Sequence, residues 1–164
     1  MRKLGLTAGI IAGAILLAAG IRGNAGGDGK AEITEIEKQA LAASTADELV
    51  KFYDQTDIIT YDYIPPLQYI GAKAVHADVD KFFSKTRDLK GDFVDLKVET
   101  DGTMGVAHSL QHFTWKGPDG ATHEATFRVT NCYHRVGGQW KIFHMHTSFP
   151  IDPTTGKAEM SLRE

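Results

Sequence analysis

The spacing of apolar residues predicts three helices in the first half of the chain. In residues 31–43 apolar side chains recur every three or four positions, with Glu and Lys between them, at Ile33, Ile36, Ala40 and Leu41. Residues 45–48 read Thr-Ala-Asp-Glu, a capping box in which the Thr hydroxyl and the Glu carboxylate each accept from an open backbone N–H. A short second helix is therefore expected to begin there. The third helix follows Gly71 and carries an apolar stripe of Val75, Val79, Phe82 and Phe83.

Elsewhere the apolar pattern predicts strands. Residues 57–63 are β-branched and aromatic and end before Pro65-Pro66, because proline cannot donate a ladder hydrogen bond. Four more strands, alternating apolar and polar, are expected at residues 94–99, 104–115, 121–135 and 139–148, with turn signals between them. Three helices followed by an antiparallel meander predict an α+β domain in which a curved sheet wraps around the helices.

The N-terminal segment differs from the rest of the chain. Arg2 and Lys3 precede an uncharged run over residues 4–21, and Gly23 and Ala25 are small residues of the kind that a signal peptidase reads. We predict a signal peptide over residues 1–25, a flexible linker over residues 26–30, one domain over residues 31–152 and a C-terminal tail over residues 153–164. The protein is then periplasmic or secreted. If the segment is retained, its length of about 18 apolar residues makes it a membrane anchor instead.

The charge and the cysteine content of the chain exclude several kinds of partner and site. The 164-residue chain has a net charge of −3, and three of its 18 basic residues lie in the first 25 positions. The remainder is more acidic still, so a nucleic-acid partner is not expected, because phosphate binding needs clustered Lys and Arg. Cys132 is the one cysteine, which excludes an intrachain disulfide and a cysteine-based zinc site.

Hairpin geometry predicts which side chains share a face of the sheet. A two-residue turn at Gly137-Gly138 places Asn131 opposite His144, and a four-residue loop at residues 117–120 places Lys116 opposite Ala121. The face so defined carries His108, His112, Asn131, Tyr133, His144 and His146. Buried imidazoles need polar partners, so we expect this face to line a pocket rather than a solid core. The opposite face carries Phe113, Trp115, Phe143 and Met145, an apolar patch that predicts a homodimer contact.

Two groups carry the candidate chemistry. Asp62 ends a predicted strand, where it is either a general base that abstracts a proton next to a carbonyl or a turn residue that accepts backbone N–H groups. His144 and His146 point the same way and either hold a developing oxyanion or make polar contacts with Asn131 or Ser148. With His108 or His112 they also offer three nitrogens to a zinc ion. Neutral imidazoles that make polar contacts satisfy the same geometry, so zinc is the weaker alternative and we predict no metal.

Several stretches resemble the SnoaL-like branch of the nuclear transport factor 2-like and ketosteroid isomerase-like superfamily, over residues 33–150. The residues that carry the resemblance are Phe52-Tyr53, residues 57–62, 65–71 and 108–110, Phe127-Arg128-Val129-Thr130-Asn131-Cys132-Tyr133, residues 138–142 and residues 144–150. The resemblance implies a cone-shaped fold, with three N-terminal helices packed in a curved antiparallel sheet, a pocket between them and frequent homodimers. By position, Asp62 resembles the general base of ketosteroid isomerases.

These observations predict an exported domain that binds a small, largely apolar organic molecule without a cofactor. The predicted catalytic residues are Asp62 and His146, for isomerase, hydratase or dehydratase chemistry. The predicted ligand-binding residues are Tyr53, His108, His112, Asn131, Tyr133, His144 and His146. The alternative is a non-catalytic ligand-binding or dimerisation module, because one fold hosts many functions.

Overall fold

The computed structural model of the chain describes residues 25–162. Within these described residues, three helices and six strands follow one another as α1 (Ala25–Leu41), α2 (Ala46–Val50), β1 (Ile59–Tyr61), β2 (Tyr69–Ile70), α3 (Ala72–Lys85), β3 (Arg87–Thr100), β4 (Met104–Lys116), β5 (Thr122–Val136) and β6 (Gln139–Ser148). The strands form one curved sheet in the order β2-β1-β6-β5-β4-β3, with β1 parallel to β6 and the other pairs antiparallel. This confirms the predicted α+β fold and the meander.

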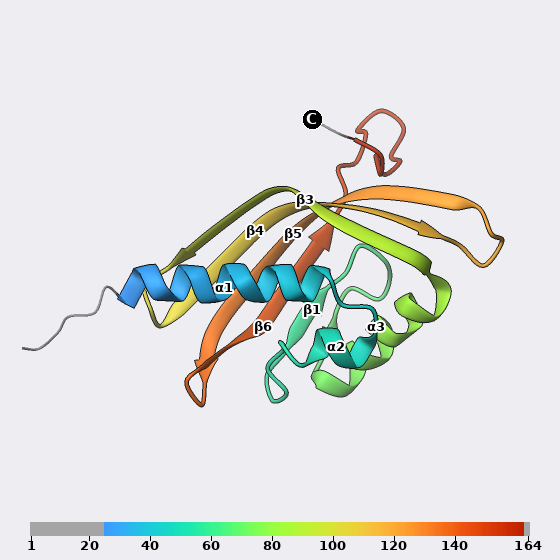
Figure 1. Cartoon of the computed structure of the whole chain (residues 1–164). Helices are drawn as coiled ribbons and strands as arrows, with labels where there is room; N and C mark the ends of the chain where they lie inside the picture. Colours follow the sequence, from blue (N-terminus) through green and yellow to red (C-terminus); the bar gives the residue numbers. More distant parts are fainter. Residues whose placement is uncertain (1–24, 163–164) are drawn as a thin grey trace, which may run out of the picture.

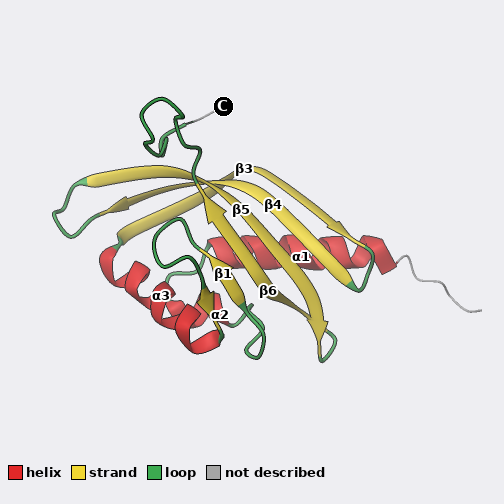
Figure 2. Cartoon of the chain, turned by 180° about the vertical axis from the view of Figure 1, so that it is seen from behind, coloured by secondary structure: helices red, strands yellow, loops and turns green. Residues whose placement is uncertain are grey.

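The helices lie on the concave side of the sheet. Helix α1 runs along the long strands, whereas α2 and α3 lie together at one end (Figure 1). Seen from behind, the sheet lies in front of α1, and its convex face carries no helix among the described residues (Figure 2). The capping box is also confirmed: Thr45 Oγ1 accepts from Glu48 N at 3.2 Å, while Glu48 Oε2 accepts from Ser44 N at 2.8 Å.

The N-terminal boundary differs from the prediction. Residues 26–30 form the first turns of α1, so the predicted flexible linker is wrong. Tertiary packing explains the difference, because a Cβ at Gly29 would lie 3.2 Å from Trp140 Cζ2, and glycine allows the helix to approach the sheet this closely. The predicted signal peptide falls on residues 1–24, outside the described residues, apart from Ala25. Within residues 25–162, none of the helices is long and apolar enough to span a membrane.

A β-bulge in β6 reverses the faces of its second half. The pairing predicted from the Gly137-Gly138 turn holds from Val136 opposite Gln139 to Tyr133 opposite Ile142, but His144 then lies opposite Cys132 instead of Asn131. Phe143 is the extra residue on β6. Because neighbouring residues of a strand point to opposite faces, this insertion turns every later side chain of β6 over.

The loop between β4 and β5 shifts the faces of β4 in the same way. Lys116 pairs with Thr122 rather than Ala121, so the loop has one residue more than predicted. Ala107, Ser109 and Gln111, which are all buried, therefore point to the concave face, while His108 is exposed. The predicted register was therefore wrong for β4 and for the second half of β6.

The C-terminal segment folds back onto the sheet. Thr126 N donates to Met160 O at 2.7 Å, and Ile151 forms an isolated bridge with Ala158. Residues 153–162 of the predicted tail are therefore held beside β5, although they project beyond the sheet in the ribbon (Figure 1).

Candidate functional site

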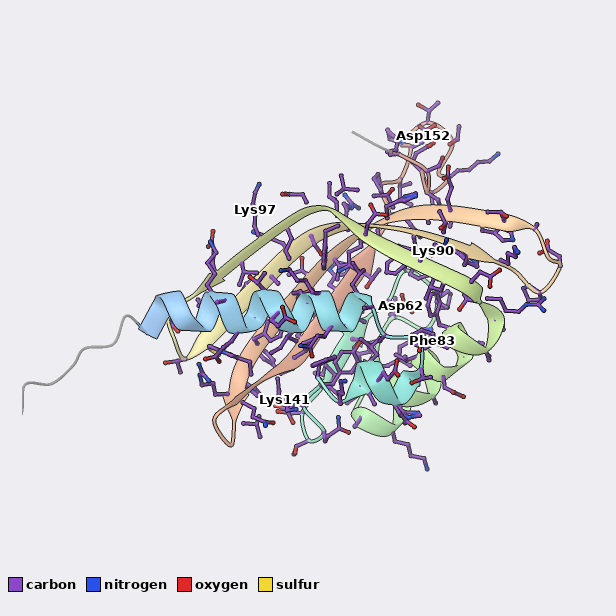
Figure 3. The ribbon with its side chains drawn as sticks, viewed as in Figure 1. Asp62, Phe83, Lys90, Lys97, Lys141 and Asp152 are labelled. Atoms are coloured by element: carbon purple, nitrogen blue, oxygen red, sulfur yellow. The ribbon has the colours of Figure 1, made fainter. Side chains whose placement is uncertain are left out.

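A cavity of about 440 Å³ lies between the concave face of the sheet and the helices. Its walls are mainly apolar and include Leu49, Phe83, Phe113, Phe127, Val129 and Met145. Asp62 and Phe83 both line it and lie on the side of the sheet that faces the helices (Figure 3). Volumes of about 300–1,000 Å³ with apolar walls and a few polar groups are typical of small-molecule sites.

Asp62 follows β1 directly and is one of the polar groups of the cavity. Its Oδ1 accepts from the backbone N–H of Tyr63 at 2.6 Å, so the local turn fixes the carboxyl. The pKa of Asp62 is raised to about 6. Burial is the largest cause, the charge of Asp78 on α3 and a hydrogen bond between the two carboxyls add to it, and the Tyr63 N–H opposes it. The cavity wall thus contains a carboxyl that changes its protonation near neutral pH.

A second set of polar side chains in the cavity centres on Glu37, which is 1% exposed and projects from the apolar face of α1. Glu37 Oε1 accepts from Tyr133 Oη at 2.6 Å and from Asn131 Nδ2 at 2.9 Å. Burial raises the pKa of Glu37, and the two hydrogen bonds oppose this shift without cancelling it. We call these three residues the Glu37 cluster.

The pKa of Tyr53 is affected by the charges of both the Glu37 cluster and the Asp62–Asp78 pair. It is buried against the core, lines the cavity, and its hydroxyl contacts Met145 Sδ at 3.7 Å. Burial raises the pKa of Tyr53, and the charges of Glu37, Asp62 and Asp78 raise it further. The Tyr53 phenol thus lies within electrostatic range of both the Glu37 cluster and the Asp62–Asp78 pair.

The model of the SnoaL-like domain family matches residues 35–152. The chain belongs to this family. Among solved structures, an NTF2-like protein of unknown function from Pseudomonas putida is 27% identical, with a TM-score of 0.75, covering 84% of this chain and 98% of its own. No curated protein matches the chain.

Two further solved structures share the fold of this SnoaL-like domain. An NTF2-like superfamily protein from Salmonella enterica is 20% identical, with a TM-score of 0.70, covering 80% of this chain and 98% of its own. A ketosteroid isomerase-like protein from Erwinia carotovora is 16% identical, with a TM-score of 0.63, covering 73% and 94%. At these identities the likeness shows the fold alone.

Within the SnoaL-like domain, three of the predicted site residues line the cavity. These are Tyr53, Asp62 and Asn131. Tyr133 is fully buried and reaches the site through its hydrogen bond to Glu37. The structure therefore brings together the predicted carboxylate and the predicted tyrosines and asparagine, but not the histidines.

The predicted placement of four histidines in the cavity is wrong. His108 and His146 are exposed, and His144 Nδ1 lies 3.0 Å from the carbonyl oxygen of Ile59. His112 is buried, with Nδ1 3.2 Å from Thr126 Oγ1, and does not line the cavity. The bulge at Phe143 and the longer loop after Lys116 caused both errors, because each inserts one residue.

The same two insertions move the predicted outer patch. Phe113, Trp115 and Met145 line the cavity instead of the convex face, while Phe143 stacks on His134 with ring centroids 4.8 Å apart. The patch that suggested a homodimer contact is therefore not present as predicted. Within residues 25–162, no group of three or more His, Cys, Asp or Glu side chains is placed to hold a metal ion.

Two residues of the site were not predicted from the sequence. Glu37 lies four residues after Ile33 and four before Leu41, so the sequence already places an acidic side chain within the apolar stripe of this helix. Asp78 is likewise three residues after Val75 and one before Val79. A charged residue on the buried face of a predicted helix was the available signal, because such a group needs a partner or a function.

Proposed function

We propose that this SnoaL-like domain binds a small, largely apolar molecule in the cavity and that Asp62 transfers protons to and from it. The domain would act outside the cytoplasm, as the pattern of residues 1–25 predicts. The observation that supports the chemistry is a carboxyl with a pKa of about 6 in the wall of an apolar cavity. A general base is most effective when its pKa lies near the working pH.

The proposed step is removal of a proton from a carbon next to a carbonyl. Asp62 carboxylate takes the proton, and the electron pair of the broken C–H bond moves towards the carbonyl oxygen to form an enolate. If a carbon–carbon double bond is conjugated with the enolate, return of the proton from Asp62 to the far end of that double bond isomerises the substrate. If the β-carbon bears a hydroxyl, that group leaves as water with the proton from Asp62, which dehydrates the substrate. Both outcomes regenerate Asp62 and need no oxidant or reductant.

The surroundings of Asp62 suit this role. Phe127, Val129 and Met145 give the cavity apolar walls, and Asp62 is partly buried there, so its carboxylate is less solvated than on the surface. Asp78 supplies a neighbouring negative charge that favours the protonated form of Asp62 after the transfer. Together they give a carboxyl that accepts a proton more readily than an exposed aspartate does.

Exchange of carbon-bound hydrogen in deuterium oxide tests the proposal even while the product is unidentified. A panel of cyclic ketones is incubated with the full chain at pD 7.5, and deuterium uptake is measured by mass spectrometry. Asp62→Asn should lower the enzyme-dependent exchange rate by about 10²–10⁴-fold, because it removes the base. The control is Asp57→Asn, the same change at an exposed residue that does not line the cavity and should retain the wild-type rate.

Two results would contradict the catalytic proposal. Equal exchange by wild type and Asp62→Asn would show that another group takes the proton. Binding of ketones by calorimetry with no exchange in any of them would favour the alternative, a non-catalytic ligand-binding module. The apolar walls serve that alternative equally well, so the exchange measurement decides between the two.

A further inference from the structure

The cavity opens to solvent between the end of α3 and the β4–β5 hairpin. These two elements lie at the same end of the molecule (Figure 1, Figure 2), and Arg87, directly after α3, pairs with Lys116 at the base of the hairpin. Residues that line the cavity and are also exposed mark its opening there, and these are Lys81, Lys85, Pro118 and His123. We call these four residues the cavity mouth.

Two of the mouth residues are lysines without an acidic partner. Lys81 and Lys85 lie one turn apart on α3, so they project from the same face of the helix. Neither forms an ion pair with an acid among the described residues. His123, the third basic residue of the mouth, lies 3.6 Å from Asp119, which balances its charge when it is protonated. The mouth therefore carries two positive charges that the fold does not compensate.

The acids of the cavity wall lie inside this mouth. Asp78 precedes Lys81 by three residues, but its hydrogen bonds go to the Asp62 carboxyl and the Tyr69 hydroxyl. Both acids are half-buried, whereas the lysines are exposed. The charges of the wall thus change sign along the cavity, from positive at the mouth to negative further in.

We infer that the ligand is an amphipathic carboxylic acid, whose carboxylate lies at the mouth between Lys81 and Lys85 while its apolar part extends into the cavity. This inference rests on the proposed function, because it assumes that the cavity receives an apolar molecule. It adds the charged group that the molecule carries and the direction in which it enters.

The arrangement of charge disfavours other ligands and other orientations. A carboxylate placed further in would meet the negative charges of Asp62 and Asp78. An ammonium group would be repelled by the two lysines, and it would have to leave water to reach those acids. A carboxylate at the mouth stays in contact with water, so it gains the attraction of the lysines at a small cost in hydration.

Matched ligands on one ring system test the inference with the full, unchanged chain. The probes are 4-(2-naphthyl)butanoic acid, its primary amide and 4-(2-naphthyl)butylamine, with dissociation constants measured by calorimetry at pH 7. In about 20 mM salt we expect the acid to bind about fivefold more tightly than the amide, the effect of two exposed charge pairs. In about 500 mM salt this preference should fall below about twofold, because salt screens exposed charges. We also expect the acid to bind more tightly than the amine.

The outcomes separate this inference from the proposed function. Equal affinity for acid and amide in low salt, a preference that salt does not reduce, or tighter binding of the amine would overturn the carboxylate site and leave the apolar cavity intact. Absence of binding by all three probes would overturn both the cavity's proposed function and the carboxylate site.

A double substitution then assigns the preference to the two lysines. Lys81→Gln with Lys85→Gln should bind acid and amide within about twofold of each other in low salt. The matched control is Lys38→Gln with Lys73→Gln, which changes the net charge equally at exposed residues that do not line the cavity and should keep the fivefold preference. Retained preference in the first variant, or its loss in the control, would overturn the assignment.

Discussion

Two carboxyl groups of the same cavity differ in what surrounds them. Burial is the first cause that raises the pKa of both Glu37 and Asp62. Glu37 is fully enclosed and accepts two hydrogen bonds from neutral side chains. Asp62 is only partly buried, accepts one backbone N–H and lies beside another carboxyl, that of Asp78.

The difference shows that burial in one cavity affects two carboxyl groups differently, because their hydrogen-bond partners differ. Glu37 lies on α1 and its two partners, Asn131 and Tyr133, lie on β5, so the hydrogen bonds of the Glu37 cluster join two fixed elements of the fold. Asp62 combines partial access to solvent with a pKa of about 6, so it gains and loses a proton within the physiological range. Three changes test this contrast.

The largest effect is expected from Glu37→Ala. It removes the shared acceptor of Tyr133 Oη and Asn131 Nδ2 and leaves both buried donors unpaired. The free energy of unfolding should fall by about 2–4 kcal/mol, measured by urea denaturation at pH 6.

Glu35→Ala is the matched control for this loss. Glu35 lies on the same helix but is exposed, so its removal should change the free energy of unfolding by less than about 0.5 kcal/mol. Equal effects of the two substitutions would show that the Glu37 cluster contributes nothing to the stability of the fold.

Asp62→Asn should stabilise the protein at neutral pH while it removes the proposed base. The folded pKa of about 6 lies above the ordinary value of 3.8, so the contribution of Asp62 to stability is present below pH 4 and is lost as the pH rises through 6. Asparagine stays neutral and avoids this loss. The variant should exceed wild type by about 1–2 kcal/mol at pH 7.5 in urea unfolding, an amount reduced by the partial exposure of Asp62.

The pH dependence provides the internal check on that prediction. The difference between Asp62→Asn and wild type should shrink as the pH falls below 6 and approach zero at about pH 3, where Asp62 is neutral in both the folded and the unfolded chain. A difference that stays the same from pH 4 to pH 7.5 would mean that the gain comes from altered packing rather than from the ionisation of Asp62.

The smallest effect is expected from Asp78→Asn. It removes the neighbouring negative charge, which is a lesser cause of the raised pKa than burial. The pKa of Asp62 should therefore fall below about 6 and stay above 3.8, measured by NMR titration of its side-chain carboxyl carbon. The control is Asp80→Asn, which changes an exposed acid on the same helix and should leave the pKa of Asp62 unchanged. An unaltered pKa in Asp78→Asn would remove Asp78 from the site.

Local signals in the sequence predicted most of the fold. The capping box at Thr45 and Glu48 and the stripe with Val75 and Val79 depend on residues three or four positions apart, which contact each other within one helix turn. The Gly137-Gly138 turn likewise fixed the first pairs of β5 and β6. The beginning of α1 escaped prediction because glycine is a poor helix former, and the close approach of Gly29 to Trp140 and Thr100 arises only in the tertiary structure.

The candidate site was predicted in part for a related reason. Asp62 was found because a carboxylate at the end of a strand indicates chemistry. Asn131 was placed by counting from the Gly137-Gly138 turn, like the histidines, and its own face on β5 was predicted correctly, so both residues line the cavity. The histidines were assigned to it by counting residues from two turns, and one extra residue in each hairpin moved them away. An error of one residue in the count turns every later side chain of a strand to the opposite face, so the predicted positions of the histidines depended on exact loop lengths and the absence of bulges.

By itself, the sequence determined the family, the helices, the meander and a chain without clustered positive charge. It did not determine which side chains meet. Glu37 and Asn131 are 94 positions apart, and only the packing of α1 against the sheet brings them within hydrogen-bonding distance. Helix periodicity and turn types act over a few residues, whereas the polar groups of this cavity arise from contacts between distant segments, and those depend on bulges, loop lengths and close approaches that the local pattern does not encode.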